Sequence, residues 1–358
     1  MGFQQGFLCS TAAGASDTWP RLELRSMLAP VTLLRAVSCV PLCARASPTL
    51  MMAPPDDALR YAFMLPTATA VATSCQLCGV GGAALFSPIF LLVFPLLGPE
   101  YPLDSAAAAI ASALLTEVFG FASGLSGYAR RGLVAWQAAF QFAAVAVPCA
   151  FAGALCVGEL AASPSALRAV YATLMLGLAS YLLLAPRPDA LVELSEDECA
   201  LDDGGTTLRS RTAADGRVLT FRAPPQGSAT SIGATGVGSF LTGLLGVGVG
   251  EVVLPQLVRG CCMPLPLAAG TSVATVVITA AAAAVVQFAT LASETGGDIV
   301  AVVPWALVKF TIPGVLLGGQ LAPLIASRGL FSDSDVERFA AFLFATVGLA
   351  FAAKALGG

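Results

Sequence analysis

The stretch GLLGVGVGEVVLP, from Gly243 to Pro255, decides how this chain folds. It is too apolar for the surface of a soluble protein and too rich in glycine for a continuous helix, and it carries one acid, Glu251. Unpaired backbone is intolerable against lipid but acceptable where it lines a cavity inside a membrane protein. The stretch therefore predicts a broken helix at a cavity, provided that its surroundings cross a membrane.

The composition indicates a protein that crosses a membrane several times. Of the 358 residues, 57% are hydrophobic and only 11% are charged, whereas soluble proteins carry about 25% charged residues. Four apolar blocks are longer than the roughly 20 residues that a helical crossing needs. These blocks are 105–129, 132–158, 267–292 and 299–327.

Charge and residue usage exclude several classes of function. The net charge is −4 and there is no basic domain, which argues against a nucleic-acid partner. The chain contains no histidine, so the commonest general base and metal ligand is missing. We therefore predict no enzyme activity, no metal site and no cofactor, and the lipid bilayer as the surrounding partner.

Polarity divides the chain into four regions. Residues 1–60 hold five arginines, scattered serines and few acids, which resembles a transit peptide for a plastid or mitochondrion; a plain tail on a plasma-membrane protein is the alternative. Residues 61–185 and 230–358 are apolar. Residues 186–229 between them are polar and lack apolar periodicity, which predicts a flexible loop.

The two apolar regions repeat each other. GVGGAALFSP, which begins at Gly79, matches GVGVGEVVLP, which begins at Gly246. Three pairs share an offset of 167: Gly79 with Gly246, Gly81 with Gly248, and Pro88 with Pro255. Three further pairs follow in order at offsets of 169 and 165: Trp136 with Trp305, Pro148 with Pro313, and Gly153 with Gly318. An ordered series of this kind indicates duplication.

In each half, the sequence predicts a segment that is interrupted by glycine and ended by proline, followed by three helices that cross the membrane fully. The broken segments cover 63–97 and 230–258. The spans that follow are 105–129, 132–158 and 166–185 in the first half and 267–292, 299–327 and 338–356 in the second. A broken segment could form a re-entrant hairpin, two tilted crossings or one broken crossing.

The distribution of lysine and arginine bears on these alternatives. If each broken segment crosses the membrane once, the repeats are parallel, and nine lysines and arginines lie on one side of the membrane and four on the other. If each broken segment crosses zero or two times, the repeats are inverted, and the cations divide ten to three. Loops 98–104 and 293–298 then lie on the side with three cations and contain no lysine or arginine themselves. The positive-inside rule favours the second arrangement. We predict an all-α membrane protein of two inverted repeats, each a glycine-broken or re-entrant helix followed by three transmembrane helices.

The glycine breaks predict an anion site. Inverted repeats with interrupted helices are typical of secondary transporters, and a broken helix presents free N–H groups with partial positive charge near the middle of the membrane. Close helix packing is the alternative role for any single glycine. The predicted substrate-binding residues are Gly79, Gly81, Gly82, Pro88, Gly246, Gly248, Gly250, Pro255, Thr271, Ser272 and Lys309.

Three ionisable side chains lie deep in apolar segments: Glu117, Glu251 and Lys309. Such residues usually face the interior of a helix bundle. We expect Lys309 to bind the anionic substrate. We expect Glu117 and Glu251 to carry a coupling proton, since burial favours the neutral carboxyl group. A structural Lys–Glu pair that locks the halves together is the alternative.

These motifs resemble the TauE/SafE family of sulfite exporters and sulfonate permeases. The two glycine motifs carry the resemblance, together with LPLAAGTSVAT from Leu265 and TIPGVLLGGQLA from Thr311, and it covers about residues 65–356. The resemblance implies export or uptake of sulfur oxyanions and sulfonates, coupled to an ion gradient. Two departures are SAAAAIAS at 105–112 in place of an AxGTS-like run, and Val249 where the family has glycine.

The sequence thus predicts a secondary transporter of small anions, sulfite or organosulfonates, with access alternating between the two repeats. A passive anion channel on the same fold is the first alternative. The second is a membrane thiol or redox protein that uses Cys75 and Cys78, whose CxxC spacing is weak evidence of a redox or metal site without a second pair.

Overall fold

The computed structural model describes residues 59–184, 208–214, 216, 218–222, 229–294, 296, 302–328 and 333–356. The predicted leader, residues 1–60, lies almost entirely outside these residues. Within them, four helices are long and apolar enough to cross a membrane. These are α7 (Ala106–Arg130), α8 (Trp136–Leu155), α14 (Leu265–Glu294) and α16 (Trp305–Arg328). The first half ends with helix α10 (Pro164–Leu184), which follows the short helix α9 (Val157–Ala161). The second half ends with helix α17 (Asp333–Leu356).

Each half begins with a helix that breaks at the predicted glycines. The first break separates α4 (Met64–Cys78) from α5 (Ala83–Pro88), and the second separates α12 (Ala229–Leu245) from α13 (Val249–Pro255). Gly79 has φ of 66°, Gly246 of 82° and Gly248 of 137°. Side chains disfavour these angles, so glycine at these three positions permits the break.

Helices α5 and α13 end at Pro88 and Pro255, but the helical backbone continues beyond each proline. Each proline is followed by a five-residue π-helical stretch, η2 (Ile89–Val93) and η3 (Gln256–Gly260). In the first half α6 (Phe94–Leu97) continues the helix further. Proline lacks the N–H that would bond to the preceding turn, and a wider π turn accommodates the missing bond.

Each broken segment turns back on itself. The Arg60 guanidinium donates to the Glu100 carbonyl at 2.9 Å, and the Tyr61 hydroxyl donates to the Tyr101 carbonyl at 2.9 Å, so the start of the first segment lies beside its end. In the second half the Ser231 hydroxyl donates to the Gln256 side-chain oxygen. These contacts place the two ends of each broken segment close to each other.

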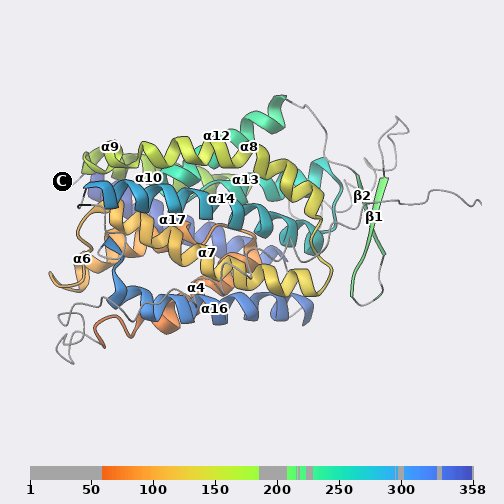
Figure 1. The fold of residues 1–358 in the computed structure, drawn as a ribbon, viewed down its shortest axis with the longest axis horizontal. Coiled ribbons are helices and arrows are strands. Elements are labelled where there is room, and N and C mark those ends of the chain that lie inside the picture. Colours follow the sequence, from red (N-terminus) through yellow and green to blue (C-terminus); the bar gives the residue numbers. More distant parts are fainter. Residues whose placement is uncertain are drawn as a thin grey trace, which may run out of the picture. The chain divides into compact units, whose positions relative to one another are not determined.

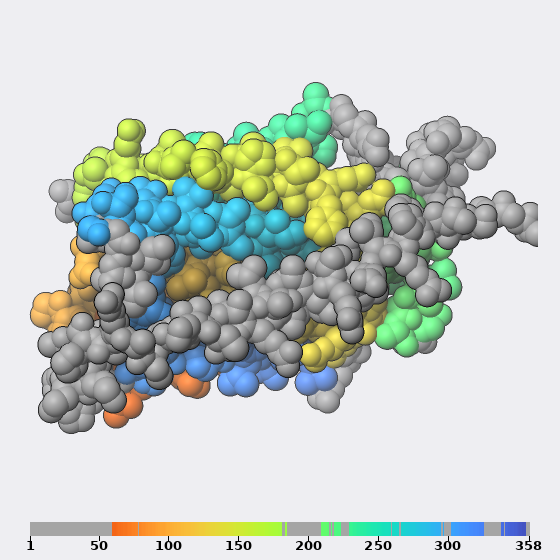
Figure 2. All heavy atoms as spheres, viewed as in Figure 1, coloured from red at the N-terminus to blue at the C-terminus, as the bar shows by residue number. Residues whose placement is uncertain are grey.

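The helices of the two halves interlock (Figure 1). Helix α4 packs on α16 and α12 on α8, while α7 contacts both α14 and α16, and α14 contacts both α7 and α8. Helix α10 packs on α17. Figure 2 shows α8 and α14 side by side on the face in view. Helices α4, α7, α8 and α10 of the first half correspond in order to α12, α14, α16 and α17 of the second. When each helix in these contacts is replaced by its counterpart, the same set of contacts is obtained.

Two pairs of equivalent helices run antiparallel. Near the end of α7, Tyr128 packs against Gly270 near the start of α14. Near the start of α10, the Arg168 guanidinium donates to the Lys354 carbonyl at the end of α17 at 3.3 Å. In both pairs a helix of the first half therefore lies beside its counterpart with the chain direction reversed.

The region predicted as a flexible loop, residues 186–229, contains a β-hairpin. Strand β1 (Leu208–Thr212) pairs antiparallel with β2 (Val218–Arg222). The part of the fold prediction that makes the chain entirely α-helical is therefore corrected. The alternation in VLTFR, where Leu219 and Phe221 share a face, was the sequence signal for a strand.

The hairpin connects the two halves at the end of the helices where α7 stops (Figure 1). The Ala214 N–H donates to the Arg131 carbonyl at 2.9 Å, and the Arg222 N–H donates to the Cys261 carbonyl at 2.8 Å. Phe221 is buried against the core. The turn after α7, the hairpin and the residues before α14 therefore lie on one side of the molecule.

Candidate functional site

The two glycine breaks touch each other at the centre of the helix bundle. A Cβ atom added to Gly250 would lie 3.0 Å from the Gly79 carbonyl oxygen, and one added to Gly246 would lie 2.7 Å from the Cβ of Ala83. Gly79 and Gly246 are equivalent positions of the repeat, as are Ala83 and Gly250. The small residues on both sides let the two backbones meet.

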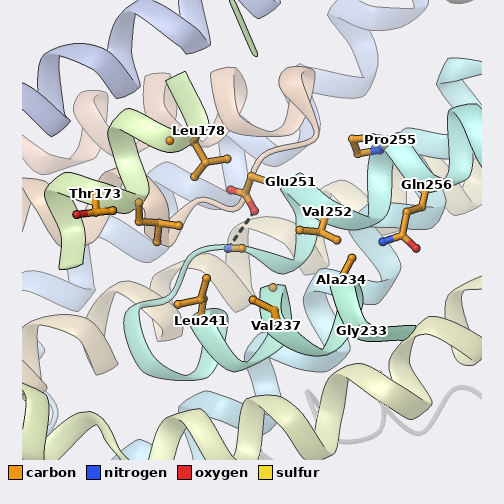
Figure 3. A pocket seen from close by; sticks show the side chains of 14 residues that line it. Thr173, Leu178, Gly233, Ala234, Val237, Leu241, Glu251, Val252, Pro255 and Gln256 are labelled. Carbon is orange, nitrogen blue, oxygen red and sulfur yellow. Dashed lines mark hydrogen bonds between the residues drawn. The ribbon is translucent and has the colours of Figure 1, made fainter. Parts of the chain in front are cut away.

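The carboxylate of Glu251 bridges the breaks. Its Oε1 accepts the N–H of Gly81 at 3.1 Å, and its Oε2 accepts the N–H of Gly248 at 3.1 Å, the bond drawn in Figure 3. The bond to Gly248 is the local one that an acid in a first helical turn makes to the residue capping that helix. The bond to Gly81 crosses to the other half. Because Gly81 and Gly248 are equivalent positions, one carboxylate binds the same amide of both repeats.

A second carboxyl group faces the same place. Glu117 on α7 is only 1% exposed, and neither of its oxygens makes a hydrogen bond of standard geometry among the described residues, although the amides of Gly82 and Ala83 face it. A Cβ atom added to Gly81 would lie 2.9 Å from Oε1 of Glu117 and 3.6 Å from Oε1 of Glu251. Two carboxylates this close repel each other, and a proton held between them removes the repulsion.

Hydroxyl groups satisfy other backbone groups that the second break leaves open. The Thr242 hydroxyl accepts the Val249 N–H at 2.8 Å. Ser272 donates to the Gly250 carbonyl at 3.5 Å, so this predicted site residue lies at the break. Thr271 accepts the N–H of Ala135 at 3.0 Å and thereby faces the start of α8.

Sequence reasoning missed Tyr171, which completes the backbone bonding of the second break. Its hydroxyl donates to the Leu245 carbonyl at 2.6 Å, and Ser87 donates to the same carbonyl at 3.4 Å. Two buried glutamines, Gln76 and Gln287, were missed as well. The available signal was the same in each case, a polar side chain inside an apolar block, where a backbone partner is required.

The remaining predicted glycine and prolines surround the breaks. Gly82 precedes α5, and a Cβ atom there would lie 3.3 Å from the ring of Phe121 and 3.7 Å from Cγ of Glu117. Pro88 is buried at the end of α5. Pro255 lies at the wall of a cavity beside α13.

The structure does not bring Lys309 to the breaks. Its side chain is exposed near the start of α16, and its ammonium lies 5.1 Å from the centre of the Phe310 ring. Thr311, two residues further along the helix, is the residue that faces inward, with its hydroxyl 3.3 Å from that of Thr116. Residues two apart on a helix point in nearly opposite directions, so Lys309 points outward, in the turn that begins with Trp305.

A cavity of about 740 Å³ reaches Glu251 from one side (Figure 3). It lies between α10, α12 and α13, and its walls are mainly apolar. Gly177 and Gly233 both border it, and a Cβ atom on either would meet nothing within 4 Å. The polar groups that it reaches include the Glu251 side chain and the backbone of Gly248.

The predicted thiol pair is described in part. Cys75 is buried in α4, and the side chain of Cys78 lies outside the described residues. Among the described residues, no group of three or more histidine, cysteine, aspartate or glutamate side chains is placed to hold a metal ion.

A scan of the chain against protein-family models matches residues 59–351 to the family described as Sulfite exporter TauE/SafE. The match includes both glycine breaks, Glu117 and Glu251. Comparisons with curated proteins and with solved structures found no match.

Proposed function

The chain belongs to the TauE/SafE family of sulfite exporters, multi-pass membrane proteins that transport anions, and we propose that it is a proton-coupled secondary transporter of sulfite or organosulfonates. The substrate binds where the two glycine breaks meet, and access to that place alternates between the two sides of the membrane. The amides of Gly81 and Gly248, held by one carboxylate, are the observation that carries this proposal.

Two inverted repeats make alternating access possible. The returning broken segments and the antiparallel pairs α7–α14 and α10–α17 support this relation. In such a pair of repeats, rocking one half against the other exchanges an inward-facing path for an outward-facing one around a fixed site. Because Gly81 and Gly248 come from different halves, that motion changes the geometry of the site directly.

Glu117 and Glu251 supply the coupling proton in this proposal. Glu117 belongs to the first half and Glu251 to the second, and both reach the same glycine. A proton held by this pair stabilises their close approach, and its loss favours their separation. Protonation therefore acts on the contact between the halves that has to change during transport.

Uptake of labelled sulfite into proteoliposomes tests the proposal. The full chain is reconstituted, and uptake is measured with and without an imposed pH gradient against empty liposomes. We expect saturable uptake that responds to the gradient. Uptake that neither saturates nor responds would indicate a passive channel, and uptake no greater than in empty liposomes, with sulfite and with organosulfonates, would contradict the proposal.

A further inference from the structure

The two carboxyl groups at the breaks are bonded very unequally. Glu251 accepts two backbone N–H groups, whereas Glu117, buried beside it, makes no hydrogen bond of standard geometry among the described residues, with the amides of Gly82 and Ala83 facing it. We propose that a substrate oxyanion binds by replacing the Glu251 carboxylate at the amides of Gly81 and Gly248, and that the displaced Glu251 pairs with Glu117. This inference rests on the proposed function for the identity of the substrate.

The group now bound by the two amides defines the ligand chemistry. A carboxylate offers two oxygens on one central atom, and here each oxygen accepts one N–H. Sulfite and sulfonates present two of their oxygens on one sulfur in the same way. A halide is a single atom, so both N–H groups would have to converge on one acceptor, whereas here they point at two separate oxygens. The site therefore selects small oxyanions, carboxylates included, over halides.

A cavity with room for a ligand lies beside this place. The 740 Å³ cavity between α10, α12 and α13 reaches both the Glu251 side chain and Gly248 (Figure 3). Glu251 is half-buried because it borders this cavity, whereas Glu117 lies behind it at 1% exposure. An entering oxyanion therefore meets the Glu251 carboxylate first.

Glu117 explains where the displaced carboxyl group goes. The segments packed around Glu251 are residues 79–83, α7, α10, α12 and α14, and within the described part of the chain they place one other ionisable acid or base near it, Glu117. The Tyr171 hydroxyl is engaged with the Leu245 carbonyl. Glu117 and Glu251 can pair only if a proton lies between them. Oxyanion binding therefore requires one proton on the pair, and it weakens at a pH high enough to remove that proton.

Glu251 could instead be only a helix cap that locks the halves together. Removal of its carboxylate has a different effect in each role. Without a lock, the protein is less stable whatever anion is present. If Glu251 is instead a displaceable ligand, its removal leaves the two amides open. A free oxyanion can then occupy them and stabilise the fold.

Melting temperatures of the purified full chain in detergent separate these roles. Glu251→Ala is measured in equal concentrations of sodium formate, methanesulfonate and chloride. We expect a saturable rise in melting temperature with both oxyanions over chloride, and a smaller rise in the wild type, where the oxyanion has to displace Glu251. Gln287→Ala is the matched control, because it removes another buried polar bond and should gain no response to oxyanions.

A second variant covers the case in which Glu251→Ala does not fold. Glu251→Gln keeps the shape and one acceptor oxygen, and it should bind methanesulfonate at least about tenfold more tightly than the wild type, or about 1.4 kcal/mol, in calorimetric titration. A response to oxyanions no greater than to chloride in both variants would overturn the proposal. If the wild type still transports sulfite, that outcome leaves the proposed function standing. Oxyanion stabilisation without any sulfite transport would instead remove the proposed function alone.

Discussion

Gln76 and Gln287 make equivalent contacts in the two repeats, but the donor and the acceptor lie at exchanged positions. Gln76 on α4 donates to the Gly120 carbonyl on α7 at 2.9 Å, and Gln287 on α14 donates to the Gly243 carbonyl on α12 at 2.6 Å. Gln76 and Gly243 are 167 residues apart, as are Gly120 and Gln287. Each repeat therefore ties its broken segment to its next helix at the same level, although neither side chain is repeated in the sequence.

Replacing either glutamine should destabilise the protein to a similar extent. Gln76→Leu and Gln287→Leu each remove a buried hydrogen bond between a broken segment and its neighbouring helix, which costs about 0.5–1.5 kcal/mol. Unfolding of each variant in detergent measures the loss. A large loss for one variant and none for the other would show that the two contacts are not equivalent.

Lys309→Ala should leave transport nearly unchanged. Its ammonium is exposed over Phe310 and lies away from the breaks, and an exposed cation–π contact contributes about 0.5–1 kcal/mol. Sulfite uptake within about fivefold of the wild type is expected, since 1 kcal/mol corresponds to a change of about fivefold. Loss of uptake in a folded, inserted variant would return Lys309 to the substrate path.

Gly250→Ala should impair transport through the contact of the two breaks. The new Cβ would lie 3.0 Å from the Gly79 carbonyl oxygen, so the backbones have to separate and the bond from Gly81 to Glu251 weakens. We expect a fall of about tenfold or more in uptake, the equivalent of 1.4 kcal/mol. Gly260→Ala is the control, because a Cβ there meets nothing within 4 Å; equal effects of the two changes would argue against this account.

Filling the cavity should block access without disturbing the fold. Gly233→Leu places a side chain where a Cβ meets no atom within 4 Å, on the wall that leads to Glu251. Melting temperature should be kept or raised, since leucine favours helix over glycine by roughly 0.5–1 kcal/mol, while sulfite uptake falls. Gly158→Leu, in open space on α9, is the matched change outside the cavity and should leave uptake intact.

Inversion of the repeats predicts which loops share a side of the membrane. An epitope inserted at the hairpin turn near Gly216 and one inserted between Gly98 and Asp104 should be accessible from opposite sides of sealed vesicles. Antibody binding before and after permeabilisation measures this. Accessibility of both from one side would contradict the inverted arrangement, whatever the protein transports.

The sequence by itself determined the membrane class and the positions of the breaks, and it predicts the duplication. Apolar blocks and the order of Gly79, Gly81 and Pro88 with their partners at an offset of 167 are local patterns, and they are readable without knowing which segments touch. Only the tertiary structure decided that the broken segments return, that Glu251 binds the amide of Gly81, and that Lys309 faces outward. The physical reason is that these outcomes depend on how helices rotate and pack against partners up to 195 residues away, and one residue of rotation turns a side chain by about 100°.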